Sequence, residues 1–90
     1  MPNVKIPAAM RRFTANNAEV AVAATSVRDA IAQLEKAHPG IAARLLDAKG
    51  AIKPYIKIFV GSDDVGGLSG LDTQLKETDE LSIVPAIAGG

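Results

Sequence analysis

The stretch Tyr55-Ile56-Lys57-Ile58-Phe59-Val60 predicts the strongest β-strand of the chain. It is rich in β-branched and aromatic residues, which strands favour. Successive side chains of a strand point to opposite faces of the sheet. The core-facing set is then Ile56, Ile58 and Val60, and the set on the opposite, helix-free face is Tyr55, Lys57 and Phe59.

A second strand is expected downstream, over residues 81–84. Pro85 closes it, because proline has no N–H and cannot continue a hydrogen-bonded ladder. Alternation places Val84 on the outer side of this strand, opposite Leu81 and Ile83. Between the two strands, the turn at 61–64 predicts a short strand around Val65.

Upstream, a helix is predicted from the spacing of four apolar residues at i, i+3, i+4 and i+7, which forms one face of a helix. These residues are Val27, Ala30, Ile31 and Leu34. Thr25 or Ser26 is the expected N-cap, and Pro39-Gly40 ends the helix. A shorter helical segment follows over residues 41–46.

The N-terminal part predicts a hairpin, with alternating strands at 4–6 and 19–23 and a turn region at 11–17. Two hairpins joined by a helix give a two-layer α+β domain. The expected fold is the β-grasp of ubiquitin, a mixed sheet of four to five strands with one main helix packed on one face. We expect residues 1–85 to form this domain and 86–90 to be a flexible tail.

Composition restricts the function. Ten basic and ten acidic residues cancel, so nothing indicates a nucleic-acid partner. The 90 residues include no cysteine, which fits a reducing cytoplasm and excludes disulfides and thiolate chemistry from the chain itself. The start has no signal-peptide pattern, and no apolar run is long enough to span a membrane.

The Gly89-Gly90 ending indicates a function for the tail. Glycine has no Cβ, so such an end is thin and can enter a slot too narrow for other residues. Five extended residues reach at most roughly 17 Å, enough to enter a partner's cleft. The carboxylate of Gly90 would become reactive toward sulfur or an amine once ATP had converted it to an acyl-adenylate.

Other candidate residues favour structural roles. His38 is expected at a helix C-terminus, where it suits the dipole. Asp63-Asp64 has no further ligands nearby, so no metal site is predicted, and Gly66-Gly67 lacks the lysine of a phosphate-binding loop. Arg11 and Arg12 could guide docking onto an acidic partner. The chain holds no nucleophile with a base, so we expect no catalytic residues and no enzyme.

Several motifs together resemble the prokaryotic ubiquitin-like sulfur carriers (the MoaD/ThiS-like family). The resemblance covers essentially the whole chain and is closest to the cysteine-biosynthesis type. Its motifs are Val4-x-Ile6-Pro7, Arg12-x-Thr14, Leu34-Glu35, His38-Pro39-Gly40, Arg44-Leu45, Tyr55-Ile56-x-Ile58-Phe59-Val60, Gly70-Leu71-Asp72-Thr73-x-Leu75 and the ending Asp79 to Gly90.

The resemblance implies a carrier whose Gly90 is adenylated by a separate ATP-dependent, ubiquitin-activating-like enzyme. Sulfide or a persulfide then displaces AMP and leaves a thiocarboxylate. The implied acceptor is a pyridoxal-phosphate cysteine synthase, and the carrier binds no cofactor of its own. The docking residues that it implies are Phe59, Val84, Ala86, Ile87 and Ala88.

Three alternatives remain open from the sequence. The same thiocarboxylate could serve molybdopterin synthesis, with the chain as the small subunit beside a molybdopterin synthase large subunit. The activated Gly90 could instead form isopeptide bonds with lysines, as in a ubiquitin-like protein modifier. Finally, the chain could be a binding module with no chemistry at its tail.

Overall fold

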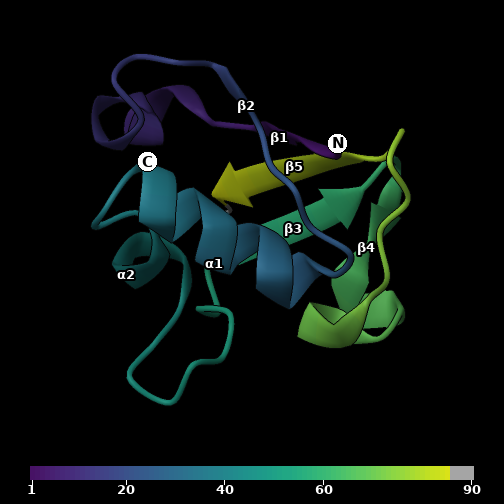
Figure 1. Ribbon diagram of the computed structural model, residues 1–90. Helices are drawn as coiled ribbons and strands as arrows, with labels where there is room; N and C mark the ends of the chain where they lie inside the picture. The colour runs from purple at the N-terminus through teal and green to yellow at the C-terminus, as the bar shows by residue number, and fades with distance from the viewer. Residues whose placement is uncertain (86–90) are drawn as a thin grey trace.

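A five-stranded mixed sheet with one main helix across it forms the body of the protein (Figure 1). The structure is a computed structural model and describes residues 1–85. The sheet order is β2-β1-β5-β3-β4, with β1 and β5 parallel and the other pairs antiparallel. The strands are β1 (Asn3–Lys5), β2 (Glu19–Ala21), β3 (Ile56–Val60), β4 (Asp63–Asp64) and β5 (Glu80–Pro85). The helices are α1 (Val27–Ala37), α2 (Ala42–Leu45) and the 3₁₀ turns η1 (Ala8–Phe13), η2 (Val65–Gly67) and η3 (Gly70–Asp72). This is the β-grasp fold predicted from the sequence.

The core lies between α1 and one face of the sheet. The four apolar residues that predicted the helix are all buried against it. From the sheet, the buried side chains include Val4, Ile56, Ile58, Leu81 and Ile83. They alternate with exposed or partly exposed neighbours, so the predicted period of two in the strands is confirmed.

Helix α1 begins and ends as local chemistry requires. The Ser26 hydroxyl accepts a hydrogen bond from the N–H of Asp29 at 3.1 Å, so Ser26, rather than Thr25, is the N-cap. At the other end, the chain reverses at Gly40, whose φ of +103° favours glycine.

Glu35 joins α1 to α2. Its carboxylate accepts hydrogen bonds from the backbone N–H groups of Gly40 at 3.0 Å and Ala42 at 2.9 Å. These donors, that of Ala42 first, lower the pKa of Glu35 from its ordinary value of 4.5, because they stabilise the charged form. The carboxylate therefore fixes the turn that follows the main helix.

Some short elements differ from the predictions. The short strand expected around Val65 lies at Asp63–Asp64, and Val65 is instead a buried residue that starts η2. The strand expected at 19–23 is β2, which ends at Ala21 rather than at residue 23. The turn region expected at 11–17 is preceded and partly replaced by η1. Its turn residues Ala15 and Asn16 do have positive φ angles.

Candidate functional site

Phe59 and Val84 lie on the same, helix-free face of the sheet. In the antiparallel register of β3 and β5, Phe59 is opposite Ser82 and Lys57 is opposite Val84. Phe59 and Val84 are thus diagonal neighbours, with Cα atoms roughly 7–8 Å apart, a distance that an aromatic ring can bridge. Val84 is 41% exposed and Phe59 is partly exposed. The structure therefore brings together the two residues predicted for docking, and we call them the outer-face patch.

The rest of this face is polar where β1 and β2 form it. Lys5 and Glu80 make an ion pair, with Nζ and Oε1 3.6 Å apart. The side chain of Asn3 donates a hydrogen bond to Glu19. Lys57 and Ser82 lie opposite Val84 and Phe59 on the same face, so the outer-face patch is small and bordered by polar groups.

The predicted tail residues lie outside the described part of the chain. These are Ala86, Ile87, Ala88, Gly89 and Gly90. The last described residue, Pro85, ends β5 and pairs with Ile56. β5 runs toward the side of the molecule that holds η1 and α2, so the described chain ends on that side (Figure 1).

An arginine–aromatic cluster lies on the same side and was not fully predicted. The guanidinium of Arg12, in η1, lies 5.0 Å from the centre of the Phe13 ring, and that of Arg44, in α2, lies 4.7 Å from it. Both arginines are exposed. The sequence singled out Arg11 and Arg12 for docking, but Arg11 donates its Nε–H to the carbonyl oxygen of Ile6 and is partly buried. Arg44 is 32 positions from Arg12, so only the fold could show that they meet.

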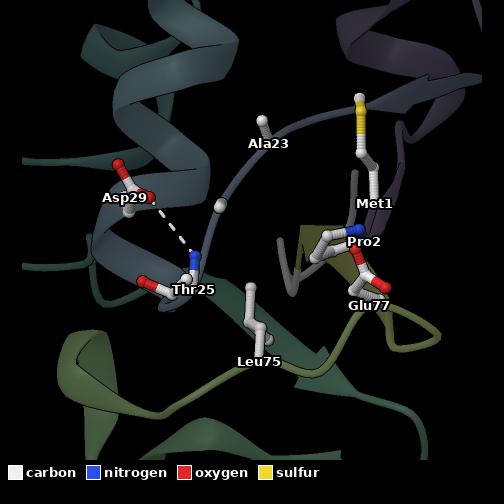
Figure 2. Close-up of a pocket in the computed structure, with 8 residues that line it drawn as sticks. Met1, Pro2, Ala23, Thr25, Asp29, Leu75 and Glu77 are labelled. Carbon is white, nitrogen blue, oxygen red and sulfur yellow. Dashed lines mark hydrogen bonds between the residues drawn. The ribbon is translucent and has the colours of Figure 1, made fainter.

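A cavity of about 340 Å³ opens near the start of β1, away from this cluster (Figure 2). Its lining includes Met1, Leu75 and two acidic residues, Asp29 and Glu77. The Asp29 carboxylate already accepts a hydrogen bond from the Thr25 N–H at 3.2 Å, so it closes the first turn of α1. No histidine lines the cavity, and among the described residues the Thr25 hydroxyl makes no hydrogen bond to either carboxylate, so the lining shows no activated nucleophile.

The remaining sequence candidates have structural positions. The N–H of His38 bonds to the Leu34 carbonyl at the end of α1. The Asp64 carboxylate accepts a hydrogen bond from the Gly66 N–H at 2.8 Å. Among residues 1–85, no group of three His, Cys, Asp or Glu side chains could hold a metal ion. None of the helices described here is long and apolar enough to cross a membrane.

Comparison with known proteins gives a consistent result. The profile of the ThiS family matches residues 4–90. The sulfur carrier protein CysO of Mycobacterium tuberculosis is 33% identical over 89 residues, which are 97% of this chain and 96% of that protein. The crystal structure of the Amycolatopsis orientalis BexX/CysO complex contains a chain with a TM-score of 0.94 and 33% identity, with full coverage of both chains.

A third relative has a different name. The small archaeal modifier protein 1 of Methanosarcina acetivorans has a TM-score of 0.83 and 27% identity, and the match covers 99% of this chain and 95% of that one. The fold and the family match agree with the resemblance seen in the sequence. The chain belongs to the ThiS family and is a sulfur carrier protein of that type.

Proposed function

We propose that this protein carries sulfur as a thiocarboxylate on Gly90. In the first step, the Gly90 carboxylate attacks the α-phosphorus of ATP in a separate activating enzyme, and pyrophosphate leaves. Sulfide then attacks the acyl carbon and AMP leaves, so that one carboxylate oxygen departs with AMP and sulfur takes its place. The chain itself binds no cofactor in this scheme, and the ATP belongs to the partner.

The observation that carries this proposal is the family match, which extends through Gly89 and Gly90. Residues 1–85 support it in a second way. Several of their polar side chains, among them Ser26, Glu35 and Asp64, are used for caps and turns, which suits a domain that positions its end for a partner. A carrier that presents its own end to a partner's active site needs no more than that.

The outer-face patch would dock on the activating enzyme. Phe59 and Val84 offer an apolar surface whose burial would stabilise the complex, and Ala86, Ile87 and Ala88 would line the path into the active site. Within a closed site, the thiocarboxylate would be protected from hydrolysis by water. The CysO protein of Amycolatopsis orientalis has been crystallised in complex with BexX, which supports docking on a second protein as a property of this fold.

The proposed acceptor is a pyridoxal-phosphate cysteine synthase, because the sequence resembles the cysteine-biosynthesis type most. The thiocarboxylate sulfur would form a bond with the β-carbon of an aminoacrylate. This bond would leave a cysteine adduct on Gly90. The alternative acceptor is a molybdopterin synthase large subunit, which would accept the sulfur without a cysteine adduct.

The first test is the mass of the intact protein after incubation with a cognate activating enzyme, ATP and sulfide. We expect an increase equal to the difference between a sulfur and an oxygen atom. A variant that lacks Gly90 should show no increase and should melt at the wild-type temperature, because the described core lies between Val4 and Ile83. Thiolation of the shortened variant would show that Gly90 is not the site.

The second test concerns the acceptor and the need for a thin end. Thiocarboxylated protein is mixed with the synthase and an activated serine, and the cysteine adduct is measured by mass spectrometry. Gly89→Val should block transfer, because a branched side chain would clash in a narrow channel. The matched control is Gly67→Val, where a Cβ meets no atom within 4 Å. Molybdopterin formed with a large subunit, and no cysteine adduct, would move the assignment to the alternative.

A protein-modifier function is the second candidate, favoured by the similarity to small archaeal modifier protein 1. In that case the activated Gly90 forms an isopeptide bond with a lysine of a target. Because the last basic residue of this chain is Lys76, trypsin would leave residues 77–90 attached to the target lysine. Detection of this remnant in cells, and its loss without Gly90, would establish the modifier function.

A further inference from the structure

The charges of this neutral protein are separated along the chain. Segment 63–80 carries six acidic residues and a single basic one, Lys76, while the rest of the chain carries nine basic and four acidic residues. Without folding, this would be only a sequence bias. In the structure, it becomes a property of the surface.

The fold places this acidic segment and two of the basic residues, Arg12 and Arg44, at opposite ends, whereas Lys5 and Arg28 pair with acidic residues of the segment. The acidic segment includes β4, η2, η3 and the loop to β5, and it meets the N-terminal end of α1, where Thr73 accepts the Val27 N–H at 3.0 Å. The C-terminal end of α1 leads instead to α2, on the same side as η1 (Figure 1). Arg12 and Arg44 lie on that side, which we call the basic end.

Arg12 and Arg44 are held in place but not neutralised. The two ion pairs among residues 1–85 are Lys5–Glu80 and Arg28–Asp72, and neither includes these arginines. A guanidinium stacked on an aromatic ring keeps the N–H groups at its edge available for a carboxylate. Because the Phe13 ring already restricts both side chains, ordering them in a complex costs less entropy than for a free arginine.

The last described strand, β5, finishes at this same end. β1 and β5 are parallel, and Lys5 lies beside Ser82. At about 3.3 Å per residue, Pro85 lies roughly 10 Å beyond Lys5, in the direction of η1. Since five residues span at most roughly 17 Å, a protein that receives Gly90 must come close to the basic end and cover part of it.

We propose that Arg12 and Arg44, stacked on Phe13, form a docking site for an acidic surface of the activating enzyme, at the entrance to the site that receives Gly90. This inference rests on the function proposed above. A neutral partner surface would strip water from two guanidinium groups without replacing it, which is costly for a charged group. Carboxylates at the entrance would replace the water with bidentate hydrogen bonds.

The test is the affinity of the unmodified protein for the activating enzyme, measured by calorimetry without ATP at two salt concentrations. Arg12→Gln/Arg44→Gln should lose about tenfold in affinity and most of the salt dependence, as expected for complementary charges at an interface. The matched control is Arg28→Gln/Lys76→Gln, which changes the net charge equally at the acidic end and should change affinity less than about twofold. Both variants should melt near the wild-type temperature.

The outcomes separate docking from sulfur transfer. Equal affinities of the two double variants would overturn the docking site, even where wild-type protein is thiolated. Arginine-dependent binding of a wild-type protein that never gains sulfur would keep the docking site and overturn the thiocarboxylate. A large fall in melting temperature confined to Arg12→Gln/Arg44→Gln, with affinity restored at low temperature, would assign the stack a structural role instead.

Discussion

Phe59 and Ile58 are neighbours in β3 that point to opposite faces of the sheet. We expect Ile58 to contribute to stability and Phe59 to contribute to binding. Ile58 is 1% exposed and lies in the core, whereas Phe59 is partly exposed on the outer face. We predict that Phe59→Asp weakens docking on the activating enzyme and lowers the free energy of unfolding by no more than roughly 1 kcal/mol, as at other surface sites. Affinity and chemical denaturation measure the two effects.

Ile58→Asp is the matched control for this prediction. It would bury an unpaired carboxylate, at a cost of several kcal/mol against a total stability of roughly 5–15 kcal/mol. The variant should therefore be largely unfolded by circular dichroism. If Phe59→Asp proved the more destabilising of the pair, Phe59 would belong to the packing of the domain and not to a docking surface.

The Glu35 carboxylate makes a contribution to the stability of the fold that depends on pH. Its pKa is lowered in the folded protein by the N–H groups of Ala42 and Gly40. Its stabilisation is therefore present above the unfolded pKa, near 4.5, and is lost as pH falls through the folded pKa. We predict that the difference in unfolding free energy between wild type and Glu35→Gln shrinks as pH falls from 6 toward 3. A constant difference over this range would contradict a role for the charge.

At the scale of elements, α1 depends on its N-cap. Ser26→Ala removes the oxygen that accepts the Asp29 N–H, and we predict a loss of about 1 kcal/mol in the free energy of unfolding. Thr25→Ala is the control, because the side chain of Thr25 makes no hydrogen bond among the described residues. A loss as large for Thr25→Ala would show that the cap is shared between the two residues.

The main elements could be predicted from the sequence because their signals are local. The alternation in 55–60 and the i, i+3, i+4, i+7 spacing from Val27 each give a face as well as an element, and both faces are confirmed. The strand β4 was displaced in the prediction because it exists only through pairing with Phe59 and Val60. Its own residues, Asp63 and Asp64, are poor strand formers.

In the candidate site too, some features follow from the local sequence and others depend on long-range packing. That Phe59 and Val84 face outward follows from alternation, but their meeting depends on the register of β3 and β5, which are 19 residues apart between Val60 and Glu80. Phe13 was assigned to a turn, and its contact with Arg44 depends on how α2 packs beside η1. Long-range packing of this kind leaves no periodic signal in the sequence.

At the scale of the whole molecule, the fold combines a covered face, an open face and two ends of opposite charge. α1 covers one side of the sheet, so the outer-face patch stays available on the other. β5 connects the two ends, since it begins at Glu80, the last residue of the acidic segment, and finishes at Pro85 on the basic side. Docking by the outer-face patch and docking by Arg12 and Arg44 would therefore both fix the orientation of β5 relative to the partner.

The separation of charge can be tested without a partner protein, by binding to a cation-exchange resin. The longest dimension of the molecule is 32 Å, whereas the Debye length is about 10 Å at 0.1 M salt. The acidic end is thus largely screened from a surface that touches the basic end. We predict that this protein, with a net charge of zero at pH 7, binds a cation-exchange resin at roughly 0.1 M salt through Arg12 and Arg44.

The same two double variants test this prediction, because each removes two positive charges. Arg12→Gln/Arg44→Gln should elute from the cation exchanger at clearly lower salt than Arg28→Gln/Lys76→Gln, since the latter changes only the end that faces away from the resin. Arg28 also pairs with Asp72, so part of its charge is already balanced there. Elution of both variants at one salt concentration would mean that the resin responds to net charge alone. The two ends would then be too weakly polarised to orient the protein on any acidic surface.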